Sequence, residues 1–548
     1  TGVQTCALPI CPERIVVTAT QTAKGTNLVK RCPSCASRTQ GEVVTRFESG
    51  TDAPVAVIAT DLYQQIPPSN DGKQRELVGQ GRKLLSFADS RQDAAFFAPS
   101  LERTYSRAVR RRLIADAVRK LAVDEPRTED LVLPVRKAAE EALVLDPDSS
   151  RVANQTEVAT WLMQEVLSFD RRSNLEGTGV AAVDVAFPRN YRPPRALLDL
   201  GLTEHEAVDL LAMLLQTLRE SGAITIPDGV DIRDEAFAPR NREIYCREEG
   251  SEPGVVAWLP AANATNRRAN LLERVFAAKQ IAASPRQTLQ QIWRYLTDPS
   301  SPLKTVLVSA NDRRFGAVWR LSHERLVFRV ASAELPPLRC SRCRQVWWRN
   351  VAGVCPTIRC DGTVSPVEDL ATLDDDHYAR MYRDTDPIGM LVQEHTAQFA
   401  AAKASSIQDE FTNGALNVLS CSTTFEMGVD VGDVQTVLLR NVPPSPANYV
   451  QRAGRAGRRV DSAALVVTFA QRRSHDFTFF ADPPRMIDGK VAPPLVLLDN
   501  PAIVRRHVHS VAFAQFAREA GGQRTVEEFF LPTDGSAPSD AFGVWLDS

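Results

Sequence analysis

The sequence predicts an α/β fold in which a parallel sheet is interrupted by a large, mostly helical insertion with a zinc ribbon. The first observation is a short apolar run, Leu84–Ala88, that leads directly into a helical segment. The second is a return to alternating strands and helices over 391–470. The third is a group of four cysteines between 340 and 360. Strand-to-helix units are the building blocks of α/β sheets, so we expect one sheet built from two distant segments.

Length and charge limit the kind of protein this can be. A chain of 548 residues is long enough for three or four domains, at about 150 residues each. A net charge of -2 excludes a uniformly basic nucleic-acid coat, so any nucleic-acid contact must come from local clusters. No apolar run approaches the roughly 20 residues of a membrane span, so we expect a cytoplasmic protein with no membrane partner.

The N-terminal residues, 1–50, are interpreted as a remnant. The chain begins at Thr1, and 1–10 resemble a translated sequencing adaptor, so we expect a fragment of a longer protein. Cys32 and Cys35 have C-x-x-C spacing, which is typical of half a zinc site, but the sequence does not decide whether they bind zinc.

The first part of the sheet is expected in 51–99. Asp89 or Ser90 caps the helix that starts at Arg91, because a short side-chain oxygen accepts hydrogen bonds from the first turn. That helix is expected to end near Phe97, and a separate basic helix is expected over 101–122. The basic edge of this second helix consists of Arg103, Arg107, Arg110, Arg111 and Arg112. We interpret this edge as a solvated face, and contact with nucleic acid is the alternative.

The insertion is assigned to 100–335. Thr203 and Glu206 form a capping box at the start of a helix over 203–222. The segment 223–229 has the pattern of a strand and turn, which suits a winged-helix module and a plain helical insertion equally well. Two further short strands are expected over 316–331.

A zinc ribbon is predicted over 336–365. Its ligands are Cys340, Cys343, Cys355 and Cys360, since two nearby thiolate pairs suit tetrahedral Zn²⁺. Unligated buried cysteines are the alternative. The surrounding basic and aromatic residues are Arg339, Arg342, Arg344, Trp347, Trp348 and Arg349. Such residues can hold a nucleic-acid backbone and stack bases, although a purely structural zinc clip explains them as well.

The rest of the sheet is expected in 366–480, followed by a C-terminal extension, 481–548. A helix that stops at Asn413-Gly414 precedes the strands, and Ser445-Pro446 opens another helix with a cap and a first-turn proline. The expected strands are 415–421, 434–442 and 464–470.

Two segments of this region carry the chemistry. The run Gln451–Arg458 alternates arginines with Gly454 and Gly457, and arginine binds phosphate oxygens bidentately while glycine lets the backbone approach closely. The loop 422–433 follows a buried strand, where α/β folds place ligand contacts. A solvated basic turn and an ordinary connection are the respective alternatives.

These two segments resemble motifs VI and V of superfamily 2 DEAD/DEAH-box helicases, and Leu84–Arg91 resembles motif IV. The resemblance implies the second RecA-like motor lobe of a large bacterial helicase. It implies catalytic roles for Gln451, Arg455 and Arg458, ATP contacts for Gly428, Asp430 and the same two arginines, and nucleic-acid contacts for Ser90, Arg91, Ser422 and Thr423.

The implied cofactors are ATP, Mg²⁺ and, at the cysteines, Zn²⁺. The implied partners are DNA, in preference to RNA, and the first RecA-like lobe of the same protein. The sequence contains no G-x-x-x-x-G-K-[ST] loop, and Asp374-Asp375-Asp376-His377 imitates a DExH motif without the preceding apolar strand. We therefore expect the fragment to be inactive without the missing lobe. The alternative function is a nucleic-acid-binding zinc-ribbon scaffold with a degenerate motor lobe.

Overall fold

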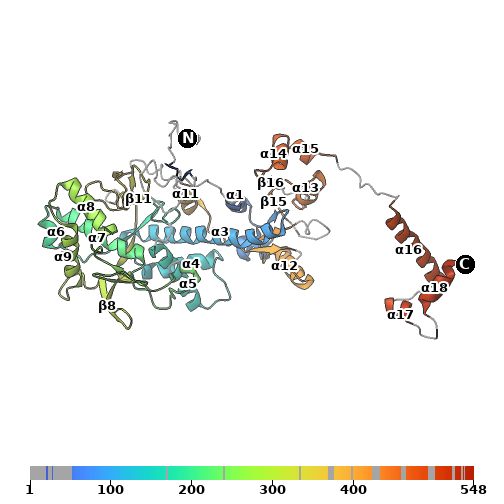
Figure 1. Ribbon diagram of the computed structural model, residues 1–548, viewed down its shortest axis with the longest axis horizontal. Helices are drawn as coiled ribbons and strands as arrows, with labels where there is room; N and C mark the ends of the chain where they lie inside the picture. The colour runs from blue at the N-terminus through green and yellow to red at the C-terminus, as the bar shows by residue number, and fades with distance from the viewer. Residues whose placement is uncertain are drawn as a thin grey trace. The chain divides into compact units, whose positions relative to one another are not determined.

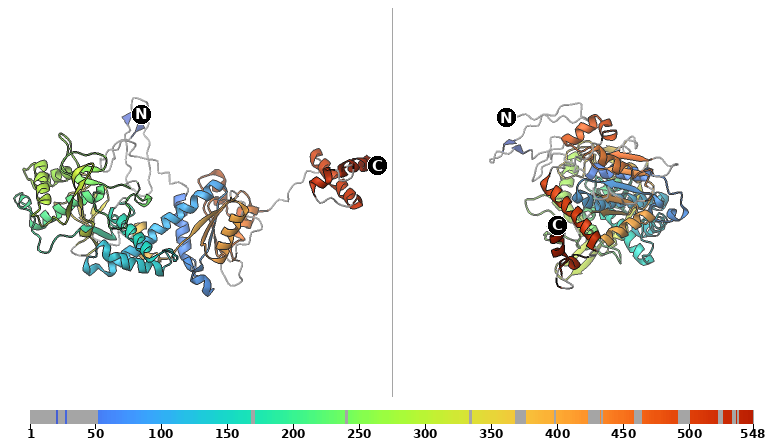
Figure 2. Two further views of the ribbon diagram at one scale, coloured as in Figure 1. Left: turned by 90° about the horizontal axis from the view of Figure 1, so that it is seen from below. Right: turned by 90° about the vertical axis from the view of Figure 1, so that its right-hand side faces the viewer.

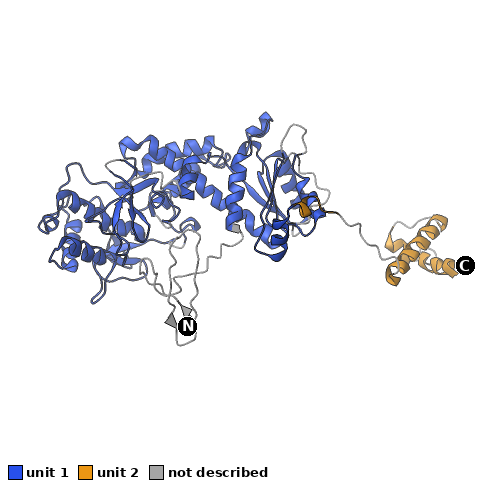
Figure 3. Ribbon diagram, turned by 90° about the horizontal axis from the view of Figure 1, so that it is seen from above, with its two compact units in different colours: residues 1–483 blue, residues 484–548 orange. Residues whose placement is uncertain are grey.

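The computed structural model forms two compact units, residues 1–483 and 484–548 (Figures 1 and 3). The described residues are 20–21, 27–28, 52–167, 171–238, 241–332, 335–367, 376–396, 399–422, 432, 434–457, 464–490, 500–520, 525–531, 535 and 537–547. The two N-terminal pairs are the short strands β1 (Thr20–Gln21) and β2 (Asn27–Leu28). Cys32 and Cys35 lie outside this described part.

A five-stranded parallel sheet organises one end of the first unit. Its order is β13 (Val392–His395), β14 (Val418–Cys421), β3 (Leu84–Phe87), β15 (Thr436–Leu439) and β16 (Leu465–Thr468). Leu84 in the central strand pairs with both Val418 and Thr436. The prediction of one sheet built from two distant segments is therefore confirmed.

Helices cover both faces of this sheet, because neighbouring residues of a strand point to opposite sides. Leu85 belongs to a core shared with α12 (Ala401–Asn413), which ends as predicted at Gly414 with a left-handed φ of 85°. Leu84 belongs to the other core, which includes α1 (Asp52–Gln65) and extends without interruption into the insertion.

One helix, α3 (Arg91–Lys120), joins the sheet to the insertion (Figures 1 and 2). The expectation of two helices, 91–97 and 101–122, was wrong. Pro99 removes one backbone hydrogen bond inside the helix, but Phe97, Leu101 and Tyr105 are all buried, so packing on both sides keeps the helix continuous.

The basic edge of α3 is only partly a solvated face. Arg103 and Arg107 are exposed. Arg111 donates to the Glu165 carboxylate at 2.6 Å, and the Arg110 guanidinium lies 4.5 Å from the Trp161 ring centre. Both partners belong to α5 (Arg151–Leu167). The inner arginines therefore attach α3 to the insertion.

The insertion contains sheets as well as helices. The capping box of Thr203 and Glu206 at the start of α7 (Glu204–Ser221) is confirmed. The segment after it forms only one bridge, Ile224 to Leu321, and no hairpin of its own. The other main helices are α4 (Thr128–Glu141), α8 (Arg267–Lys279) and α9 (Pro285–Thr297).

Two small sheets complete the insertion. A four-stranded sheet has the order β6 (Val255–Ala257), β5 (Tyr245–Arg247), β8 (Gly316–Leu321) and β7 (Leu307–Asp312). A separate pair is β4 (Ala181–Val185) with β9 (Leu326–Val330). The two strands expected over 316–331 exist, but they belong to different sheets.

The second unit is helical in its described part. It comprises α15 (Pro484–Ile487), α16 (Pro501–Ala520), α17 (Val526–Phe530) and α18 (Pro538–Asp547). Across the described residues of the whole chain, no helix has the length and apolar character needed to traverse a membrane.

Candidate functional site

The carboxyl edge of the parallel sheet gathers the segments that carry chemistry. Because β3, β14 and β15 are parallel, the residues that follow them emerge at the same edge. These residues are Asp89 and Ser90 after β3, Ser422 after β14, and Asn441 after β15. Ser90 caps α3, since its hydroxyl accepts from the Asp93 backbone N–H at 3.3 Å.

The arginine-glycine run begins on a short helix, α13 (Pro446–Ala453). Ser445 caps this helix as predicted, accepting from the Asn448 N–H at 3.3 Å. The chain then turns back toward the sheet, where the Gly457 N–H donates to the Val434 carbonyl at 2.9 Å. Gly457 has a φ of 73°, and a Cβ there would lie 2.5 Å from the Ala464 Cβ. The close approach requires glycine at this position.

Arg452 is the only buried residue of α13, and its side chain is fully buried. Its guanidinium pairs with the Asp89 carboxylate at 2.5 Å, across 363 residues of sequence. Asn441 holds Asp89 in place, since its side-chain amide donates to that carboxylate and its oxygen accepts from the Asp89 N–H at 3.3 Å. Loops after β3 and β15 therefore both anchor the start of the arginine run.

This pairing was missed from the sequence, although a signal existed. A short helix with one arginine on its buried side requires an acidic partner, because an unpaired buried charge is costly. The sequence predicts Asp89 as a candidate helix cap and as part of the segment that resembles motif IV, and Ser90 performs the capping role instead.

Arg455, the predicted catalytic arginine, lies in the turn after α13 and is 8% exposed. Its backbone N–H donates to the Arg452 carbonyl at 3.2 Å. Burial raises the pKa of the Cys421 thiol well above its usual value, and the positive charge of Arg455 partly opposes that rise. Arg455 therefore lies close enough to the end of β14 to act electrostatically on it.

A second network closes the same edge beside β15 and β16. The buried Asp476 carboxylate, on α14 (Ser474–Ala481), accepts from the backbone N–H groups of Val442 at 3.1 Å and Gln471 at 2.8 Å. The Arg440 guanidinium donates to the Asp93 carbonyl at 2.6 Å, inside the first turn of α3. The described residues of this edge are thus linked to one another by hydrogen bonds.

The remaining predicted site residues have different environments. Gln451 and Arg91 are exposed, Ser90 is half-buried, and Ser422 is fully buried directly after β14. The predicted contacts that lie outside the described residues are Thr423, Gly428, Asp430 and Arg458. Asp376, from the DExH-like sequence, caps α11 (His377–Asp384) by accepting from the Tyr378 and Ala379 N–H groups.

The four predicted metal ligands converge in one cluster. They are carried by a small sheet of β10 (Leu338–Cys340), β11 (Val346–Trp347) and β12 (Val364–Pro366) and by the loops between them. All four sulfur atoms lie within 4.8 Å of one another.

The geometry of the cluster can be compared with that of a metal centre. The Sγ atoms of Cys340 and Cys360 are 3.7 Å apart, and those of Cys343 and Cys355 are 3.6 Å apart. Tetrahedral Zn²⁺ with bonds of about 2.3 Å separates its sulfur ligands by about 3.8 Å. A hydrogen bond from the Cys355 thiol lowers the pKa of Cys343 to about 4, toward the thiolate form that binds metal. The cluster therefore fits zinc.

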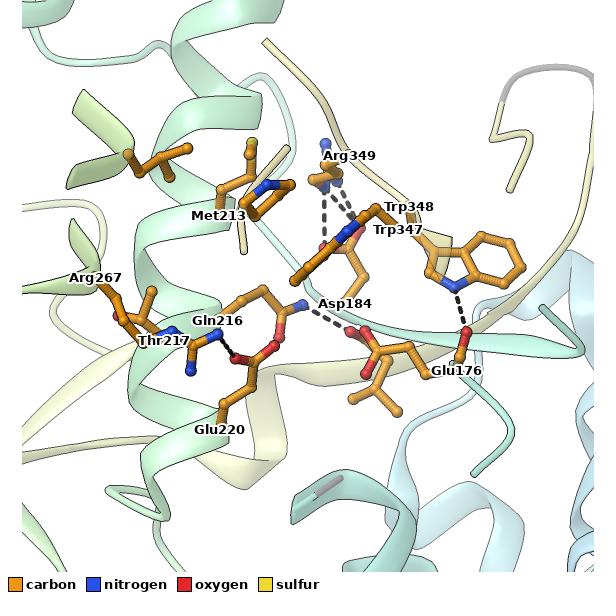
Figure 4. Close-up of a pocket in the computed structure, with 13 residues that line it drawn as sticks. Glu176, Asp184, Met213, Gln216, Thr217, Glu220, Arg267, Trp347, Trp348 and Arg349 are labelled. Atoms are coloured by element: carbon orange, nitrogen blue, oxygen red, sulfur yellow. Dashed lines mark hydrogen bonds and ion pairs between the residues drawn. The ribbon is translucent and has the colours of Figure 1, made fainter. Parts of the chain in front are cut away.

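The aromatic residues beside this cluster point inward, into a pocket between the ribbon and the insertion (Figure 4). The Trp348 indole N–H donates to the Glu176 carbonyl at 3.1 Å. Arg349 donates to the Asp184 carboxylate at 3.0 Å and also pairs with the Asp209 carboxylate. These contacts favour a structural clip over a base-stacking surface.

Comparison with known proteins gives a consistent set of matches. Residues 366–460 match the model of the helicase conserved C-terminal domain. Druantia protein DruE of Escherichia coli is 43% identical over 146 residues, which cover 24% of this chain and 8% of DruE. The Lhr helicase/probable uracil glycosylase of Mycolicibacterium smegmatis is 26% identical over 123 residues, covering 22% and 8%. The ATP-dependent helicase HRQ1 of Saccharomyces cerevisiae is 32% identical over 127 residues, covering 22% and 12%. The matched segments thus represent 8 to 12% of these relatives.

Proposed function

We propose, from the premise that this chain carries the C-terminal region of a superfamily 2 helicase, that it is the second motor lobe of an ATP-dependent nucleic-acid helicase or translocase. The observation that carries the proposal is the position of Arg455. It follows a short helix at the carboxyl edge of a parallel sheet, and the buried Arg452–Asp89 pair anchors the end of that helix. This anchor fixes the backbone before Arg455 at the edge, and the Arg455 side chain, 8% exposed in this lobe, would turn outward to a phosphate group held by an opposing lobe.

In this proposal, Arg455 and Arg458 stabilise the negative charge that spreads over the transferring phosphoryl group of ATP. Guanidinium groups suit this role because they are planar, permanently charged and able to bind two oxygens at once. Mg²⁺ and most phosphate contacts are assigned to the first lobe. Gln451, Gly428 and Asp430 are assigned to the nucleotide side of the second lobe.

The nucleic-acid contacts are assigned to the loops after β3 and β14, through Ser90, Arg91 and Thr423, whereas the fully buried Ser422 would support the second loop from within. Hydroxyl, guanidinium and backbone N–H groups hold phosphodiesters without reading sequence. DNA is proposed in preference to RNA on the resemblance to large bacterial DEAD/DEAH-box helicases of genome maintenance or phage defence. Parallel stimulation assays with single-stranded DNA and RNA separate the two substrates.

The test of the ATPase role is Arg455→Ala in a protein that contains both lobes. Loss of an arginine that acts on the phosphoryl group is expected to reduce nucleic-acid-stimulated ATP hydrolysis roughly 10³-fold or more. Arg472→Ala is the matched control, because Arg472 is exposed on the same lobe. Turnover of the Arg455 variant within a few-fold of the control would contradict the proposal.

We also propose that the four-cysteine cluster binds one structural Zn²⁺. The close packing around the sulfurs supports this, since a Cβ on Gly362 would lie 2.5 Å from the Cys340 Sγ. Zinc would hold the ribbon loops together, and the ribbon in turn supplies Trp348 and Arg349 to the insertion. The metal's role is therefore in folding the insertion and not in the reaction.

A further inference from the structure

Helix α16 of the second unit has a strongly one-sided charge. The stretch from Asn500 to Arg518 contains Arg505, Arg506, Arg518 and two histidines but no aspartate or glutamate. Glu519, at the C-terminal end of α16, is its acidic residue, and the other described acidic residues of this unit are Asp488, Glu527, Glu528, Asp540 and Asp547. Over its first 18 residues, α16 is therefore basic, and its acidic residue lies at the C-terminal end.

The basic residues of α16 border a shallow, open groove within the second unit, coloured orange in Figure 3. Its residues on α16 form one stripe with spacings of three, four and seven, as expected for a single helix face. They are Ala502, Arg505, Arg506, His509, Ser510 and Phe513.

Aromatic rings form the rest of the groove. The Phe513 ring stands edge-on to Phe529 at a centroid distance of 5.0 Å and edge-on to Phe542 at 5.4 Å. All three rings are only partly buried. The groove therefore combines an exposed cationic wall with accessible aromatic carbon.

The two arginines have no acidic partner in the described part of the unit. Both side chains are exposed, and no ion pair among the described residues involves either of them. The nearest acidic residue along the helix, Glu519, instead accepts hydrogen bonds from Gln515 and Trp545. Their charges are thus available to a ligand.

We propose that this groove is a second nucleic-acid site, which binds a short single-stranded segment of the substrate. This proposal rests on the proposed helicase function. Arg505 and Arg506 bind consecutive phosphates, for which guanidinium geometry is suited. The phenyl rings contact the unpaired bases, since base–aromatic stacking works without sequence preference. A duplex is excluded from this mode because its bases are already stacked on one another. The site belongs to the second compact unit and not to the motor lobe.

The test is fluorescence anisotropy of a labelled single-stranded oligonucleotide with the 548-residue chain, measured over a range of KCl concentrations. Losing two phosphate contacts in Arg505→Ala/Arg506→Ala is expected to reduce the slope of log K against log salt by about 1.4, at about 0.7 per contact. At about 0.1 M salt, this corresponds to roughly 25-fold weaker binding. Arg518→Ala is the matched control on the same helix, because Arg518 does not line the groove.

Replacement by lysine at both positions keeps the charge and is expected to preserve the salt slope. If the double alanine variant keeps the wild-type affinity and salt slope, the proposal that the groove binds a single strand is overturned, and the proposed helicase function is unaffected. The two arginines would then be assigned to a surface that binds another protein. An equal loss in the Arg518 variant would also overturn the groove proposal, since the effect would then be general charge. A wild-type chain that binds no single strand would also overturn the groove proposal, whereas the proposed function is tested separately by Arg455→Ala in a protein that contains both lobes.

Discussion

Asp89→Asn removes the negative charge that neutralises Arg452 and keeps nearly the same side-chain shape. The Arg452 side chain is fully buried, whereas that of Asp89 is 35% exposed. Removing one partner of a fully buried pair costs about 3–5 kcal/mol, and partial solvent screening at Asp89 lowers the expected cost to about 2 kcal/mol. The penalty should be local, because the pair connects α13 to the end of β3.

Hydrogen–deuterium exchange measures this local cost in a chain too large for two-state unfolding. A loss of about 2 kcal/mol corresponds to roughly 30-fold faster exchange through local opening, expected in peptides that cover 446–457. The double variant Asp89→Asn/Arg452→Met should exchange more slowly than the single Asp89 variant, since no buried charge is left unpaired. Unchanged exchange in the single variant, or additive effects in the double, would refute the anchoring role.

Two further predictions concern the metal cluster and the turn after α13. Elemental analysis should find about one zinc per chain, and this zinc should be lost in Cys340→Ser. Cys246→Ser is the control and should keep the zinc, because the buried Cys246 thiol is outside the cluster. Metal-free protein with unchanged folding would contradict the zinc site. Gly457→Ala should destabilise the turn by about 1–3 kcal/mol, because the new Cβ meets Ala464 and φ is positive. Faster exchange around Val434 should report it, and exchange equal to wild type would show that the turn adapts.

Local chemistry made part of the fold predictable. The caps at Ser90, Thr203 and Ser445 and the left-handed Gly414 depend on neighbouring residues only, and all four occur where the sequence indicates them. The strand at Leu84–Phe87 is also local in origin, since both faces of a central parallel strand are buried and its residues are almost all apolar.

Features that depend on distant partners could not be predicted. Pro99 indicates a helix end by every local rule, but the shared core around Phe97 and Leu101 keeps α3 continuous. The inward orientation of Trp348 depends on Glu176, which is 172 residues away in the sequence. The same limit applies to the candidate site: its arginines were identified from their spacing, whereas the acidic partner of Arg452 was not.

The continuity of α3 has a mechanical consequence. At 1.5 Å per residue, its 30 residues form a rod about 45 Å long. One end is held among the loops of the sheet by Ser90, Arg440 and the neighbouring Asp89, and the other end is embedded in the insertion's core. A tilt of about 10° about Ser90 would displace Lys120 by about 8 Å over that length. Such a tilt would carry the insertion with it, and it would also have to shift the packing of Leu101 and Tyr105 in the core that they share with Val392.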